Sequence, residues 1–226
     1  ANYDSGDYSL ALNKALDEAS YQSLLAEQQM RREQNSVVQL GIGLAAYVEI
    51  TAPTGLHSEY GAVEVNEDGT VTARVGTSAH GQGHVTAFSM LISDLLGIEM
   101  DKITILQSDT DEISRGTGTM GSRSLQTAGS AVHVASETVL DKAKELASHL
   151  LEANPEDVVT GEGGLHVTGV PTNSLSWSEL VTASNDDGKR PPGMEPGLSH
   201  ELDFDGTDST FPFGAHVAVV EVDTET

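Results

Sequence analysis

GTSAHGQGH at residues 76–84 and GTGTMGSRS at residues 116–124 are two glycine-rich stretches, and each lies between an alternating apolar pattern and a helical pattern. Glycine has no side chain, so it adopts positive φ and lets a ligand approach the main chain. The helix that follows such a loop points unpaired N–H groups and the positive end of its dipole toward the same place. We therefore expect the loops to wrap an anion, so the predicted ligand carries phosphate or is similarly polar.

The order of strand, glycine-rich loop and helix occurs twice, and periodicity predicts the other elements around it. We expect strands at residues 37–51, 60–65, 70–75, 103–106, 165–168 and 216–222. Helices are expected at two short segments within 7–34, with Asp7 and Ser20 as N-caps, at 84–96, at 126–152 and after the capping box that begins at Ser176.

The predicted fold class is α+β, with mixed β-sheets flanked by helices and both glycine-rich loops at one end. The repeated pattern indicates that the two loops converge on one pocket. We divide the chain into residues 1–152, which carry both loops, and residues 153–226, a second α/β portion. Residues 185–209 are rich in Asp, Gly and Pro, so we expect a long surface loop there.

The composition of the chain limits which classes of partner it can bind. The chain has 226 residues, of which 38% are hydrophobic, and this supply is sufficient for a core. Its formal net charge of -24 argues against nucleic acid or an anionic membrane as a partner, because both require basic patches. Scattered carboxylates are screened beyond a Debye length of ~8 Å, so local amide donors can still hold a phosphate. We interpret the charge as a solubilising surface in preference to a cation-binding one, and adaptation to salt would produce the same charge.

Some chemistries are excluded by what the sequence lacks. The chain contains no Cys, which excludes disulfides, thiolate catalysis and a cysteine-held iron–sulfur cluster within it. No run approaches the ~20 apolar residues of a membrane helix, and residues 1–7 show no signal-peptide pattern. We therefore expect no membrane insertion and a cytoplasmic location.

The loops taken alone are a weak signal. Neither matches the dinucleotide fingerprint or the Walker pattern with its Lys, and a structural turn remains the alternative. His80 and His84 are spaced like a metal-binding pair, but Gly81 stands where the hydrolase motif has Glu. A phosphate-binding hydrolase would need a base near Ser78, and the sequence offers no obvious one.

The loop sequences themselves resemble a known family, together with NYDSGDY at residues 2–8 and GIGLA at residues 41–45. They are similar to the molybdenum-cofactor-binding large subunit of the xanthine oxidase family of molybdenum hydroxylases. The similarity is greatest to the branch of the aerobic carbon monoxide dehydrogenase large chain. It is strong from residue 2 to about residue 152 and looser beyond, where FPFGAHVAVVEV at residues 211–222 also fits the family.

This resemblance implies a set of cofactor-binding residues: Gly81, Gln82, Gly83, His84, Thr119, Gly121, Ser122, Arg123 and Ser124. The Gly-Gln-Gly segment is implied to lie against the molybdenum centre and the pterin, with Gln82 as a neutral amide donor near the metal's ligands. No residue of the chain is implied as a direct metal ligand. Arg123 is implied to offset phosphate charge, with an ion pair to Asp109, Asp111 or Glu112 as the alternative.

The resemblance also implies a reaction, the oxidative hydroxylation of an aldehyde, an N-heterocycle or carbon monoxide. Molybdopterin, expected in its cytosine dinucleotide form, would carry the chemistry. FAD and [2Fe-2S] clusters are expected on other chains or domains. The implied partners are therefore the remaining large-subunit segments, the iron–sulfur and flavin subunits and a small-molecule substrate.

The family's catalytic apparatus is expected to lie partly outside this chain. The glutamate general base is expected elsewhere, because Glu162 stands in the wrong context for that role. The residues that select the substrate are also expected outside, so the sequence does not name the substrate. We expect a fragment that is inactive alone, with a non-catalytic binding or assembly domain of the same fold as the alternative.

Overall fold

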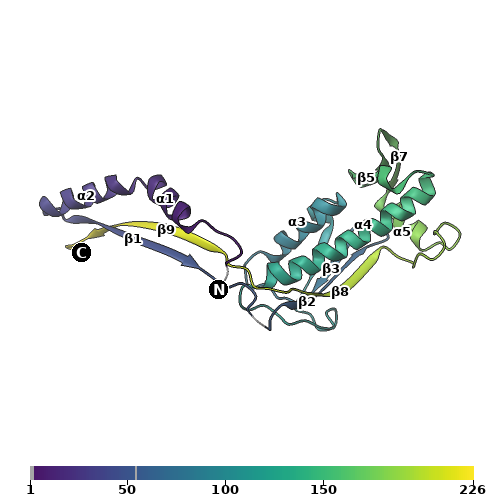
Figure 1. Cartoon of the computed structure of the whole chain (residues 1–226), viewed down its shortest axis with the longest axis horizontal. Coiled ribbons are helices and arrows are strands. Elements are labelled where there is room, and N and C mark those ends of the chain that lie inside the picture. The colour runs from purple at the N-terminus through teal and green to yellow at the C-terminus, as the bar shows by residue number, and fades with distance from the viewer. Residues whose placement is uncertain (1–2, 54) are drawn as a thin grey trace. The chain divides into compact units, whose positions relative to one another are not determined.

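The computed structural model describes residues 3–53 and 55–226. Asn2 of the quoted motif at residues 2–8 lies outside the described residues. The chain divides into two compact units (Figure 1). Unit 1 comprises Ala1–Thr51 and Ser209–Thr226, and unit 2 comprises Ala52–Asp208. Both glycine-rich loops belong to unit 2.

Unit 2 is built on a four-stranded mixed sheet with the order β4-β3-β2-β8. Its strands are β2 (Ser58–Val65), β3 (Val71–Val75), β4 (Ile103–Leu106) and β8 (Ser199–Asp205). β2 pairs antiparallel with β3 and β8, whereas β3 pairs parallel with β4. The predicted hairpin of β2 and β3 is confirmed, and Gly69 adopts φ +82° in its turn.

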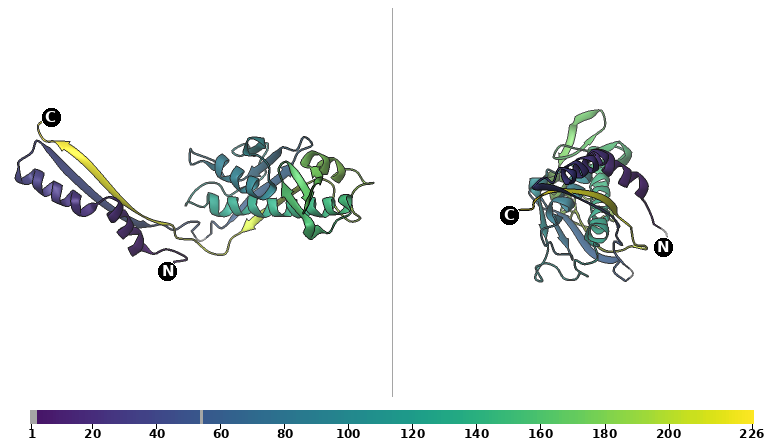
Figure 2. Two further views of the ribbon diagram at one scale, coloured as in Figure 1. Left: turned by 90° about the horizontal axis from the view of Figure 1, so that it is seen from above. Right: turned by 90° about the vertical axis from the view of Figure 1, so that its left-hand side faces the viewer.

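Two helices cover one face of this sheet, α3 (His84–Leu96) and α4 (Ser130–Leu151), and they lie side by side (Figures 1 and 2). α3 ends at Gly97 in the left-handed conformation, as its sequence predicts. The helix predicted at 126–152 begins instead with a π-helical turn, η2 (Leu125–Gly129), before α4. α4 approaches β2 so closely that a Cβ built on Gly61 would lie 2.6 Å from the Cβ of Ala131.

The second half of unit 2 shares the core of the first. Two 3₁₀ turns, η1 (Met100–Lys102) and η3 (Pro155–Asp157), precede β4 and β5. A three-stranded antiparallel sheet of β5 (Val158–Gly161), β6 (Gly164–Val167) and β7 (Val170–Ser176) leads into α5 (Trp177–Ser184). The predicted capping box of Ser176 and Glu179 is present, whereas the sequence predicted only one of these three strands.

The compact units do not follow the boundary that we predicted at residue 152. Leu165 and Trp177, after that boundary, belong to the same buried cluster as Val63 and Phe88, before it. A division at 152 therefore cuts through one continuous hydrophobic core. The cofactor-binding role assigned to residues 1–152 stays a prediction.

The long loop predicted at 185–209 is wrong at Ser199–Asp205, which form the strand β8. The segment SHELDFD alternates between exposed and half-buried side chains, as an edge strand does. Its outward acidic residues keep a sheet edge soluble, and they made the segment look like a loop in the sequence.

Unit 1 is a two-stranded antiparallel sheet with two helices. β1 (Val38–Val48) pairs along its whole length with β9 (Phe213–Asp223), and α1 (Tyr8–Glu18) and α2 (Tyr21–Glu33) contact them. The predicted N-cap of α1 is confirmed, since the Asp7 side chain accepts a hydrogen bond from the Leu10 N–H at 2.8 Å. The predicted cap at Ser20 is wrong, because this residue is left-handed and its side chain makes no capping bond.

Candidate functional site

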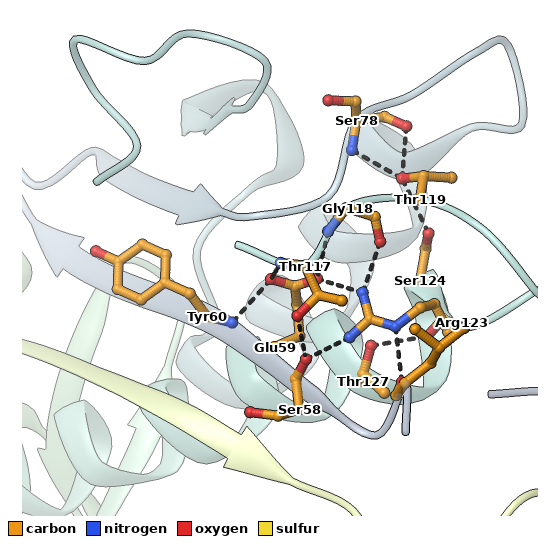
Figure 3. Close-up of polar contacts among 11 residues, drawn as sticks. Ser58, Glu59, Tyr60, Ser78, Thr117, Gly118, Thr119, Arg123, Ser124 and Thr127 are labelled. Atoms are coloured by element: carbon orange, nitrogen blue, oxygen red, sulfur yellow. Dashed lines mark hydrogen bonds and ion pairs between the residues drawn. The ribbon is translucent and has the colours of Figure 1, made fainter. Parts of the chain in front are cut away.

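The two glycine-rich loops touch each other through their main chains. A Cβ built on Gly116 would lie 2.5 Å from the Cα of Gly76, so neither position has room for a side chain. Farther along the loops, the Ser78 N–H donates to Thr119 Oγ1 at 2.8 Å, and the Thr119 hydroxyl donates to the Ser78 carbonyl at 2.8 Å (Figure 3). The predicted convergence of the two loops is confirmed by these contacts.

Beyond this contact, the loops line one pocket of about 580 Å³ within unit 2. Side chains or main chain of both loops and of the helices that follow them form its wall: His80, Gln82, His84, Ala87, Phe88, Thr119, Met120, Gly121, Ser122, Ser124 and Leu125. Six of the nine residues assigned to a cofactor from the resemblance are among them. Gly81 and Gly83 stand between wall residues, and Arg123 is set apart from the pocket.

Gly81 and Gly83 give the first loop its open main chain. Their φ angles are +106° and +81°, which L side chains rarely adopt. A Cβ built on either residue meets no atom within 4 Å, so no protein packing explains the lack of a side chain. The backbone beside Gln82 is therefore accessible to a ligand.

Hydrogen bonds orient the polar side chains of the first loop. The side-chain oxygen of Gln82 accepts a hydrogen bond from the His80 N–H, so the NH₂ group of Gln82 is left to donate. Gln107, at the end of β4, accepts from the Ala79 N–H at 3.1 Å through Oε1, and the same oxygen lies 3.3 Å from His84 Nδ1. This contact is a hydrogen bond when His84 Nδ1 carries a proton, and in that tautomer Nε2 is the ring's acceptor.

Arg123 is buried and is not among the residues that line the pocket. Its side chain is 0% exposed, and its guanidinium pairs with Glu59 of β2 (Figure 3). Its ion-pair partner is therefore Glu59 and not Asp109, Asp111 or Glu112, the alternative partners in its own loop. Its predicted contact with phosphate stays a prediction. The sequence pattern missed the pair because Glu59 and Arg123 are 64 positions apart.

Glu59 is the site-supporting residue that the sequence analysis did not single out. Its carboxylate accepts hydrogen bonds from the Thr117 N–H at 3.1 Å and from the Gly118 N–H at 3.2 Å. A signal was present, because Glu59 occupies the same face of its strand as the apolar Val63 and Val65. A carboxylate at an inward strand position requires a buried partner.

The helix that leaves the second loop also departs from regular geometry beside the pocket. η2 is a π-helical turn, and π-turns occur frequently at functional sites. The Arg123 carbonyl accepts both the Thr127 N–H at 2.8 Å and the Thr127 hydroxyl at 3.0 Å, which anchors this turn.

Two classes of site are not found in the part of the chain that the structure describes. Residues 3–53 and 55–226 contain no group of three or more His, Cys, Asp or Glu side chains arranged to hold a metal ion. Within the same ranges, no helix combines the length and the apolar character that a bilayer crossing requires.

Comparison with known proteins gives a family match over almost the whole chain. The family described as "Molybdopterin cofactor-binding domain" matches residues 14–226. The carbon monoxide dehydrogenase large chain of Afipia carboxidovorans is 35% identical over 99% of this chain and 29% of its own length. The 6-hydroxypseudooxynicotine dehydrogenase complex subunit gamma of Paenarthrobacter nicotinovorans is 34% identical over 100% of this chain and 28% of its length. The chain thus spans about three tenths of these relatives.

Solved structures agree with the sequence comparison. The reconstituted CO dehydrogenase from Oligotropha carboxidovorans matches with a TM-score of 0.85 and 35% identity, covering 98% of this chain and 29% of that one. The quinoline 2-oxidoreductase from Pseudomonas putida 86 matches with a TM-score of 0.84 and 28% identity over the same shares. The predicted fold class, a mixed α and β architecture of this kind, is confirmed.

Proposed function

The chain belongs to the family of molybdopterin cofactor-binding domains, and on that premise we propose that the pocket between its two glycine-rich loops holds the pterin of the molybdenum cofactor. The observation that carries the proposal is the pocket itself. Two segments about 40 residues apart contribute to its lining, and the main chain at Gly81 and Gly83 is open where side chains would stand.

The groups around the pocket fit a polar heterocycle that bears phosphate. Gln82 would donate its NH₂ group. Ser122 and Ser124 line the pocket, and the Ser124 hydroxyl donates to Thr119 Oγ1 at 3.2 Å, so its oxygen would accept from a ligand. The first turn of a helix presents N–H groups that its own carbonyls cannot satisfy, and both loops run into such a turn. His84 would accept a ring N–H through Nε2.

Arg123 holds the second loop without lining the pocket, and its charge is paired with that of Glu59. Phosphate binding would therefore rest on neutral N–H donors, each of which contributes roughly 1 kcal/mol net. We propose the cytosine dinucleotide form of the cofactor, as the resemblance implies. When bound, the molybdenum centre would supply the oxidative chemistry, and this chain's residues would bind and orient the pterin.

The function proposed for the assembled protein is that of a molybdenum-dependent oxidoreductase that hydroxylates an aldehyde, an N-heterocycle or carbon monoxide. The relatives whose names support this include dehydrogenases and a "Nicotine 6-hydroxylase large subunit". We propose further large-subunit segments, with iron–sulfur and flavin subunits, as partners, and a small molecule as substrate. The cytoplasmic location stays a prediction.

Substitution of an open glycine in the assembled enzyme tests the proposal. Gly81→Val should lower the molybdenum and pterin content per polypeptide by at least about tenfold, which corresponds to about 1.4 kcal/mol of binding. Gly193→Val is the matched control, because Gly193 also has positive φ, +89°, and open space but does not line the pocket. Equal cofactor content in the two variants would contradict a pterin at this pocket. A wild-type assembly without pterin would favour the non-catalytic binding or assembly domain.

A further inference from the structure

The buried pair of Glu59 and Arg123 makes more contacts with main chain than an ion pair needs. Arg123 and Glu59 are 0% and 1% exposed. Besides the carboxylate, the guanidinium donates to three carbonyls, those of Leu56 at 2.8 Å, Gly118 at 2.6 Å and Ser58 (Figure 3). Two of these carbonyls belong to the chain entering β2, and the third belongs to the second loop.

Glu59 also binds the second loop at Gly118, through the N–H group of that residue. Its carboxylate accepts the N–H groups of Thr117 and Gly118, and also the N–H of Tyr60 at 3.0 Å. Gly118 is thus fixed at its N–H by Glu59 and at its carbonyl by Arg123. Gly118 adopts φ +95°, a backbone conformation that helices and strands do not contain. Its peptide groups are therefore held by these side chains and not by a regular backbone pattern.

The clamped residues flank those that face the pocket. Thr119 follows Gly118 directly, lines the pocket and bonds Ser78 of the first loop. Ser122 and Ser124 also line the pocket and stand on either side of Arg123. The pair therefore fixes both ends of the segment from residue 119 to residue 124.

Stability alone is a poor reason for this arrangement. Apolar residues of similar volume often replace a buried ion pair with no loss of stability, because desolvation of the charges offsets their attraction. An apolar pair cannot, however, fix the direction of a peptide N–H or carbonyl. The distinctive effect of Glu59 and Arg123 is therefore the conformation of the second loop.

We propose that Glu59 and Arg123 are positioning residues, a clamp that holds residues 117–124 in the conformation that presents Thr119, Ser122 and Ser124 to the pocket ligand. This inference rests on the proposed pterin-binding function. Without the clamp, the second loop samples other conformations, and the ligand then bears the free-energy cost of ordering it.

The test compares the wild-type assembled enzyme with the double variant Glu59→Leu/Arg123→Met, which removes both charges together and leaves no uncompensated ion in the core. Hydrogen exchange of peptides covering residues 116–124 and 76–84 is measured in the cofactor-free assembly. Molybdenum and pterin content is measured after purification from a cofactor-producing host. The melting temperature reports the fold.

We expect the double variant to fold but to melt at a lower temperature than the wild type, because main-chain groups of residues 56, 58, 60, 117 and 118 lose their side-chain partners. Exchange at residues 117–118 should quicken by at least about tenfold. Exchange within 76–84 should change less, and pterin content should fall by at least about tenfold. Wild-type exchange at 117–118, or wild-type pterin content despite faster exchange, would overturn the proposal. A wild type that binds no pterin would refute the proposed function, and the exchange comparison would still decide whether the clamp orders the loop.

Arg123→Lys provides a second route if the double variant does not fold. Lysine keeps the charge but replaces the planar fork with a single ammonium, so it cannot reach all four acceptors. We expect partial loss of protection at residues 117–118 and intermediate pterin content. Wild-type values for both quantities in Arg123→Lys would overturn the proposal, because the fork would then be dispensable.

Discussion

The two glycine-rich loops use glycine for different physical reasons. Gly81 and Gly83 of the first loop have positive φ, and a Cβ built on either meets no protein atom within 4 Å. Only the backbone conformation and a bound ligand would therefore oppose a side chain at these positions. Gly116 and Gly121 of the second loop are packed, the first against Gly76 and the second with a built Cβ 2.9 Å from Pro53 Cδ. The first loop is thus open at Gly81 and Gly83, whereas Gly116 and Gly121 of the second loop are fitted against their own protein.

The anchors of the two loops differ in the same way. The first loop is held by neutral hydrogen bonds to Gln107, at the end of β4. The second is held by the buried charges of Glu59 and Arg123. The second loop therefore has a charged anchor and the first a neutral one.

The two loops should differ most in the stability that is lost when the anchor of each is removed. In the full chain, Glu59→Ala should lower the free energy of unfolding by about 3–5 kcal/mol, because Arg123 keeps its buried charge without a partner. Gln107→Ala, the corresponding change for the first loop, should cost about 1–2 kcal/mol, since only neutral hydrogen bonds are lost. Urea unfolding measures both variants. Equal losses would contradict the difference between a charged and a neutral anchor.

Packing at the loop contact should give the next largest effect. Gly116→Ala would place a Cβ 2.5 Å from the Gly76 Cα and 2.6 Å from the Gly76 carbonyl oxygen. Backbone cannot move aside as a flexible side chain does, so we expect a loss of about 3 kcal/mol in the free energy of unfolding. The result should appear in urea unfolding of the full chain. A loss below that of Gly81→Ala would show that the loops separate easily.

Gly81→Ala should have a smaller effect on stability. Its new Cβ meets no protein atom, so only the unfavourable φ of +106° opposes it, at a cost of about 1–2 kcal/mol. Gly193→Ala is the control, with φ +89° and equally open surroundings. Thermal or urea unfolding should give similar losses for the two variants. A much larger loss at Gly81 would indicate that the first loop is packed and not open.

Local signals predicted much of this fold from the sequence. The Asp7 cap, the turn at Gly69, the end of α3 at Gly97 and the capping box at Ser176 each depend on residues within a few positions of one another. Such signals are written in short stretches of chain, and all four are confirmed. They also located both loops, which the resemblance then assigned to one cofactor.

Features that depend on distant residues were not predicted. The pairing of β1 with β9 joins residues 38–48 to residues 213–223, and no local pattern specifies it. The same limitation hid the partner of Arg123, because an arginine beside a glycine-rich loop fits a phosphate as well as a buried glutamate. The sequence thus predicted which segments form the pocket and six of the residues that line it, but not that Arg123 is buried against Glu59.

The smallest predicted effect concerns Tyr60, whose ring contacts Arg115 at the start of the second loop, and it is expected at alkaline pH. Burial and the hydrogen bond to Glu201 raise the pKa of Tyr60, and Arg115, next to Gly116, lies 4.2 Å from the centre of its ring. An unfolded tyrosine ionises near pH 10 and the folded one at higher pH, so the folded chain binds more protons in that window. This stabilising contribution is therefore present below pH 10 and is lost as the pH rises through the folded pKa.

Tyr60→Phe should remove that alkaline loss and cost less than about 1 kcal/mol at pH 7, because Glu201 can be solvated once its hydroxyl partner is gone. Urea unfolding of the wild type and the variant between pH 8 and pH 11, roughly spanning the tyrosine range, gives the two stability profiles. The difference between them isolates Tyr60, since every other titrating group is common to both chains. We expect the profiles to converge as the pH rises above 10. Profiles that stay parallel would show that Tyr60 keeps the same proton affinity on folding, which would contradict a pKa raised by burial and by the bond to Glu201.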